Sequence, residues 1–147
     1  MNIIFREVDP FNCWIWMKFS EIPTEAEKKY LDQLFDSWYT IGTLGGFNSE
    51  NLQTHEEGSD LSWMSYDNNQ KDSASPALMH NVGEMEYQNI WGRFWVDFGG
   101  SDSISIDILI NSLNEISNKY VKIEELIIGG ENNDWAVEEH EDLVFKD

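Results

Sequence analysis

The stretch IWGRFWVDF at residues 90–98, followed at once by GGSD at residues 99–102, decides the fold. Alternate residues of a β-strand point to opposite faces, so this stretch divides into two sets. One set suits a protein core: Ile90, Gly92, Phe94, Val96 and Phe98. The other set mixes indole rings with charges: Trp91, Arg93, Trp95 and Asp97. We therefore predict a strand with one core face, and its opposite face is the first candidate site.

A second two-faced strand is predicted over residues 13–19, which read CWIWMKF. Its core side would carry Cys13, Ile15, Met17 and Phe19, and its other side Trp14, Trp16 and Lys18. The shorter alternation at residues 62–67 predicts a further strand, which includes Trp63. Residues 121–128 are rich in β-branched side chains and predict the last strand, and residues 2–8 predict a short edge strand.

Two helices are expected between these strands. Thr24 and Glu27 have the spacing of a capping box, and apolar residues then recur every three or four positions, so we predict a helix over residues 24–41 that ends at Gly42. Its expected core stripe is Ala26, Tyr30, Leu34, Trp38 and Ile41. A second helix, capped by Ser101 or Asp102, is predicted to end near Lys119. The apolar residues within 77–89 match neither the two-residue period of a strand nor the 3.6-residue period of a helix, so no element is predicted there.

The order strand, helix, strand, strand, helix, strand is that of a ferredoxin-like α+β sandwich, with both helices on one face of an antiparallel sheet. Right-handed crossovers would place the strands at residues 13–19 and 90–98 side by side in the middle of that sheet. At 147 residues we expect one domain, with its core at about residues 11–130 and an acidic tail at residues 131–147.

The composition limits the partners and the compartment. Hydrophobic residues make up 41% of the chain, so it should fold, but its formal charge of −19 repels phosphate backbones and anionic membranes. No window approaches a membrane span, and the single Cys13 fits a reducing compartment, so a cytoplasmic location is expected. We expect no nucleic-acid partner, no membrane partner, no cofactor and no metal site.

If the core sides of the strands meet the helices, the opposite face of the sheet collects aromatic rings and charges: Trp14, Trp16, Lys18, Trp63, Trp91, Arg93, Trp95 and Asp97. A large exposed apolar patch marks an interface or a ligand surface unless other segments cover it. Three interpretations stay open at this point. The first strand, residues 77–89 or the tail could cover the face; two copies could pair through it; or its indoles could stack on a ligand whose anionic group contacts Arg93 and Lys18.

The leading hypothesis is a non-catalytic interaction or binding module that works through this aromatic face, with a homodimer as one form. The alternative is a small-ligand-binding protein or an enzyme whose pocket lies between the face and residues 77–89, using His80, Arg93 and Asp97. A metal or acid/base cluster at His80, Glu84 and Glu86 would require that segment to fold back on itself. No nucleophile motif such as G-x-S-x-G is present.

Several motifs resemble a known family: DPFNCWIW at residues 9–16, GGFNSENLQ at residues 45–53, and WGRFWVDFGGSD at residues 91–102. With DILINSL at residues 107–113 and IGG at residues 128–130, the chain resembles a family of uncharacterised proteins from cyanobacteria and plant chloroplasts, a domain of unknown function. The resemblance implies a setting in cyanobacterial cytoplasm or plastid stroma, and the absence of a transit-peptide pattern favours a bacterial origin. It implies no activity, cofactor or catalytic residue.

Overall fold

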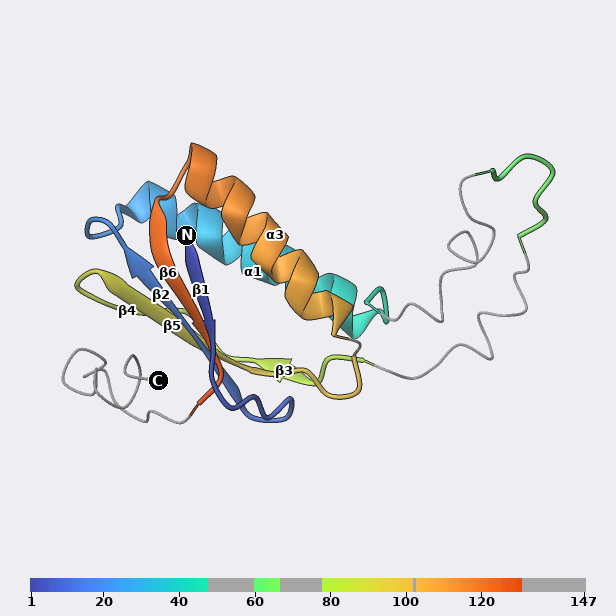
Figure 1. Ribbon diagram of the computed structural model, residues 1–147, viewed down its shortest axis with the longest axis horizontal. Coiled ribbons are helices and arrows are strands. Elements are labelled where there is room, and N and C mark those ends of the chain that lie inside the picture. The colour runs from blue at the N-terminus through green and yellow to red at the C-terminus, as the bar shows by residue number, and fades with distance from the viewer. Residues whose placement is uncertain (48–59, 67–77, 102, 131–147) are drawn as a thin grey trace.

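The computed structural model describes residues 1–47, 60–66, 78–101 and 103–130, which form one six-stranded sheet and two helices. Figure 1 shows both helices packed against the same face of the sheet. The elements in chain order are β1 (Asn2–Phe5), β2 (Cys13–Phe19), α1 (Glu25–Thr43), β3 (Asn81–Val82), β4 (Glu86–Gln88), β5 (Trp91–Asp97), α3 (Ile104–Lys119) and β6 (Ile123–Ile128). The mixed α+β class that was predicted is confirmed.

The sheet order is β1-β6-β2-β5-β3, and β4 also pairs with β5. Strands β2 and β5 are antiparallel neighbours, with Trp14 opposite Trp95 and Trp16 opposite Arg93, so the predicted central pair is confirmed. The sheet is not wholly antiparallel, because β1 runs parallel to β6. The prediction of a purely antiparallel sheet is therefore wrong at this edge, where an N-terminal strand has been added to it.

The strand predicted at residues 62–67 is wrong over the part that the structure describes. Residues 60–66 form a turn and irregular chain, in which Trp63 has φ +67° and a fully exposed side chain. The strand position beside β5 is instead taken by β3 and β4. Both come from residues 77–89, for which no element was predicted. Five alternating residues can adopt a strand only where a partner is available, and β5 takes its partner from residues 81–88.

Helix α1 begins as predicted, because Thr24 Oγ1 accepts from the Glu27 amide and Glu27 accepts from the Thr24 amide. Its buried residues are Leu31, Phe35, Trp38 and Gly42. The predicted stripe is therefore confirmed at Trp38 and at Leu34, which packs against the core, and wrong at Ala26, Tyr30 and Ile41, which are exposed. Gly42 does not end the helix. It lies inside the last turn, where a Cβ would meet the buried side chain of Met79, so a larger residue there would require that side chain to shift.

Helix α3 begins at Ile104 with Ser103 at the N-cap position, so Ser101 is not its cap, and Asp102 lies outside the described residues. Leu109 and Leu113 are fully buried and face the sheet, but Tyr120 is 58% exposed and stacks on Tyr30 with ring centroids 5.1 Å apart. Within the described ranges, neither helix has the length and apolar character needed to cross a bilayer.

The main core lies between the sheet and the two helices, and Cys13 is part of it with no exposed surface. Burial raises the pKa of its thiol from 9.0 to about 11. The fraction of reactive thiolate at pH 8 is therefore about 100-fold lower than in an exposed cysteine, and reagents must also reach a closed core.

We predict that native protein at pH 8 resists a thiol reagent, with labelling at least about 100-fold slower than for the same chain in denaturant. Mass spectrometry after timed quenching measures the rate, and the unfolded chain is the internal control. Labelling of the native chain at the rate of a free thiol would contradict the burial of Cys13.

Candidate functional site

The register of the central strands brings most of the predicted aromatic face together. Trp14, Trp16 and Lys18 of β2 lie opposite Trp95, Arg93 and Trp91 of β5, respectively, so all six side chains share the sheet face away from the helices. Asp97 follows two positions after Trp95 and belongs to the same set. Trp63 does not join them, because it lies in the turn at residues 60–66.

The centre of this aromatic face is buried. Trp16 and Trp91 are each 2% exposed and pack with Ile127, and the partly buried Ile4, Trp14 and Ile90 lie against them. The Lys18 ammonium lies 5.8 Å from the centre of the Trp91 ring. These indoles therefore form a second, smaller core and offer no open stacking surface.

Arg93 is also buried, at 7% exposed, and its Nε donates to Glu86 Oε2 over 2.8 Å. Its guanidinium lies 4.5 Å from the centre of the Trp14 ring and 5.1 Å from that of Trp16. Among the ion pairs of the described residues, Arg93 is paired with Glu86 and not with Asp97, although both lie on the same face of β5. The Arg93 guanidinium is therefore held by one carboxylate and two indoles. These contacts stabilise this side of the sheet.

His80 and Asp97 meet at the end of β5, four residues along the strand from Arg93. His80 Nδ1 lies 3.4 Å from Asp97 Oδ2, while Asp97 Oδ1 accepts from the Gly99 amide over 2.9 Å. The indole of Trp95 donates to Asn12 Oδ1 over 2.7 Å. Glu86 is engaged with Arg93, so the proposed cluster of His80, Glu84 and Glu86 does not form.

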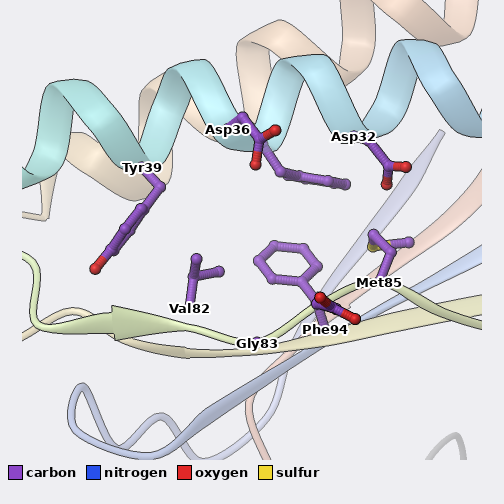
Figure 2. Close-up of a pocket in the computed structure, with 9 residues that line it drawn as sticks. Asp32, Asp36, Tyr39, Val82, Gly83, Met85 and Phe94 are labelled. Carbon is purple, nitrogen blue, oxygen red and sulfur yellow. The ribbon is translucent and has the colours of Figure 1, made fainter.

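A cleft of about 580 Å³ lies on the other side of the same strand segment, facing helix α1. Figure 2 shows residues of α1 pointing down toward the segment between β3 and β4, with the Phe94 ring rising between them. We call it the acidic cleft. Its lining residues are Asp32, Phe35, Asp36, Tyr39, Val82, Gly83, Glu84, Met85 and Phe94.

A β-bulge builds one wall of the acidic cleft. Val82 pairs with Val96 and Glu86 pairs with Arg93, so three residues of the edge strand oppose two residues of β5. One extra residue in a strand bends it and re-aims its side chains. Here the bulge at residues 83–85 brings Glu84 and Met85 to the cleft, and the Gly83 amide still bonds to the Trp95 carbonyl over 2.7 Å.

The floor and the rim of the acidic cleft differ in chemistry. Phe35 and Phe94 are 5% and 1% exposed, and their rings meet at a centroid distance of 4.3 Å. The rim carries Asp32, Asp36 and Glu84, all exposed. In the part of the chain that the structure describes, these three carboxylates take part in no ion pair, and no three His, Cys, Asp or Glu side chains converge to hold a metal ion.

The rim carboxylates influence one another. Partial burial raises the pKa of the Asp32 carboxyl above its ordinary 3.8, and the negative charges of Asp36 and Glu84 raise it further. Next to them, Tyr87 has a buried hydroxyl with no hydrogen-bond partner in the described structure. Burial, followed by the charges of Asp32 and Glu25, raises the pKa of Tyr87, so this phenol stays neutral.

We predict that Asp32→Asn stabilises the protein at neutral pH. The raised pKa means that the folded state disfavours the charged carboxylate, so the native protein loses stability as pH rises through the pKa of folded Asp32. Because Asp32 is exposed, solvent screening reduces the gain to a few tenths of a kcal/mol, roughly.

Urea unfolding at a series of pH values from 7.5 downward measures this gain, which should shrink as the pH falls through the raised pKa of folded Asp32. Glu124→Gln is the matched control, because it removes one charge from an exposed position of β6. An Asp32→Asn protein that is no more stable than the Glu124→Gln protein at pH 7.5 would mean that the charge of Asp32 does not lower the free energy of unfolding.

The sequence prediction missed the cleft because its residues carry no motif. Asp32 and Asp36 were indistinguishable from the other acids of a chain with 28 of them, and the bulge lay in the unassigned segment. The available signal was the spacing of Val82, Met85 and Tyr87, which shifts by one residue where the bulge lies.

A protein-family model described as "Protein of unknown function (DUF3531)" matches residues 1–143, and thus nearly the whole chain. The comparisons with curated proteins and with solved structures give no match. The match assigns the chain to a family and leaves its chemistry to be inferred from the sites described above.

Proposed function

The chain belongs to the DUF3531 family of proteins of unknown function, and since that membership assigns no activity, we propose from the geometry that it is a non-catalytic small-ligand-binding protein. The observation that carries this proposal is the acidic cleft, a concave space of about 580 Å³ above two buried aromatic rings. Ligand sites have this size, an apolar floor and a few polar groups. The described lining residues include no serine, cysteine or histidine, so a nucleophile of one of these three kinds is not among them.

A ferredoxin-like framework is part of the proposal. The order β6, β2, β5 and then the edge formed by β3 and β4, together with two helices on one face, supports it. In this interpretation β3 and β4 are one bulged strand, and β1 is an addition beside β6. We also propose a cytoplasmic location in a cyanobacterial or plastid setting, without nucleic-acid or membrane partners, because the net charge of −19 repels both surfaces.

The test is an amide NMR titration of the full chain with fragment-sized molecules, divided equally among cations, neutral molecules and anions. We expect saturable shifts at the amides of Val82, Gly83 and Met85 with at least one fragment. Asp36→Trp, which places an indole at the rim, should abolish these shifts. Ser37→Trp, at the next and exposed position of the helix, should retain them.

Two outcomes contradict the proposal. One is a full fragment set that produces no saturable shift at the cleft. The other is an Asp36→Trp protein that binds the same fragments as the parent chain does.

Self-association is the second candidate, favoured by the edge strand β1. In the described structure β1 pairs with β6 alone, and Ile3 and Phe5 are 36% and 54% exposed. Exposed strand edges pair readily with a second chain. Sedimentation analysis of the parent chain and of Phe5→Lys tests this candidate. A concentration-dependent dimer that Phe5→Lys weakens supports it, and a parent chain that stays monomeric refutes it.

A further inference from the structure

The three rim carboxylates of the acidic cleft come from two separate elements. Asp32 and Asp36 lie one helical turn apart on α1, and Glu84 lies on the bulge opposite them. Like charges placed this way repel each other, which is why Asp36 and Glu84 both contribute to the raised pKa of Asp32. A chain with 28 acids has many unpaired carboxylates, so their number alone decides nothing.

Three carboxylates without basic partners among the described residues would attract a cation. The side chains around them indicate which kind of cation the cleft would bind. The two rings under the rim, Phe35 and Phe94, are nearly inaccessible, and Val82, Met85 and Tyr39 complete an apolar wall. A cleft rimmed by negative charges attracts organic ammonium and guanidinium groups, and apolar walls bind the carbon body that carries such groups. A bare metal ion would gain nothing from these walls.

The ion pairs of the described residues join no basic side chain to the rim, and this includes Lys28 and Lys29, which precede Asp32 by four and three residues. Lys28 lies one turn before Asp32, but its ammonium is 3.4 Å from Glu25 Oε1 and 4.9 Å from the centre of the Tyr87 ring. It is thus turned toward β4 and the start of the helix. The negative potential of the cleft therefore remains available to a ligand, whereas an anion would meet three carboxylates.

We infer that the acidic cleft takes a small organic cation, an ammonium or guanidinium group on an apolar body, with its charge near the rim of Asp32, Asp36 and Glu84 and its body against Tyr39, Val82 and Met85. This inference rests on the proposed function and adds the class of ligand to it. The bulge at residues 83–85 is then the specificity device, because a regular edge strand would lack the extra residue that brings Glu84 to the rim.

The test uses three probes with the same phenyl body: phenethylamine, phenethyl alcohol and 3-phenylpropionate, which are cationic, neutral and anionic at pH 7. Each is titrated into the full chain while the amides of Val82, Gly83 and Met85 are followed by NMR. We expect saturable shifts with phenethylamine, at least about tenfold weaker binding of the alcohol, and no binding of the propionate. Raising the salt concentration should weaken the binding of phenethylamine.

The variant arm separates charge from shape. Asp32→Asn combined with Asp36→Asn should weaken phenethylamine binding about fivefold to tenfold while leaving the alcohol unaffected. Glu124→Gln should change neither. Unfolding of each variant by urea verifies that the fold persists, which the expected stability of Asp32→Asn favours.

The possible failures are distinct. If the alcohol or the propionate binds as well as phenethylamine, or if the double variant binds phenethylamine as the parent does, the ligand class is wrong and the binding function stands. If neither these probes nor the fragment set moves the cleft amides, the proposed function fails as well.

Discussion

Phe94→Ala is expected to destabilise the protein by about 3–5 kcal/mol, the usual cost of removing a buried aromatic side chain. Phe94 is 1% exposed, and its ring lies 4.3 Å from Phe35 and 6.3 Å from Trp38 between ring centroids. The surrounding rings come from α1 and cannot move in to fill the space without shifting the helix. Domains of this size have a stability of roughly 5–15 kcal/mol, so about a fifth or more of it would be lost.

Chemical denaturation measures the effect as a shift in midpoint at an unchanged slope. Phe5→Ala is the matched control, since Phe5 is 54% exposed on the edge strand and should cost less than about 1 kcal/mol. Phe94→Leu should fall in between, because it leaves a smaller cavity. Equal costs for the substitutions at positions 94 and 5 would show that Phe94 is not the ring on which sheet and helix pack.

Gly99→Ala is expected to cost about 2–4 kcal/mol for two separate reasons. Gly99 has φ +59°, a left-handed conformation that costs other residues about 1 kcal/mol or more. A Cβ there would also lie 2.2 Å from the Leu78 carbonyl oxygen and 2.6 Å from the His80 ring. A backbone carbonyl cannot rotate away, so the segment entering β3 must shift, and overpacking of this kind costs about 1–3 kcal/mol.

The control for Gly99→Ala is the next residue. Gly100 is exposed and is not among the glycines with positive φ, so Gly100→Ala should be nearly neutral. Thermal unfolding of both variants makes the comparison. Similar melting temperatures for the two would contradict the close approach of Leu78 to Gly99.

The central part of the fold was predictable because two independent patterns agree there. Strands β2 and β5 each alternate cleanly over seven residues, and the capping box at Thr24 and Glu27 marks the start of the helix that follows β2. Alternation specifies which side chains share a face, and the order of the elements predicted which strands are neighbours. These two patterns were sufficient to predict that β2 pairs with β5.

A physical reason explains why the sequence did not predict the edge strands β3 and β4 or the acidic cleft beside them. A bulge shifts the alternation by one residue, so Val82 faces the core and the next inward residues are Met85 and Tyr87. Such a spacing matches neither a strand nor a helix. The aromatic face was foreseen as a set of residues, but alternation does not reveal exposure, and Trp16, Trp91 and Arg93 proved to be buried.

The pairing of β1 with β6 also bears on how the chain folds. Asn2 pairs with Glu125, and β2 lies between β5 and β6, so most of the sheet joins segments from opposite ends of the sequence. The exception is the hairpin of β4 and β5, which turns at Asn89 and is the natural place for ordering to begin. Contacts this distant make folding slow, on the order of milliseconds to seconds. During synthesis, β2 must wait for β5 to emerge and β1 must wait for β6, and over this interval the apolar strands are most exposed to aggregation.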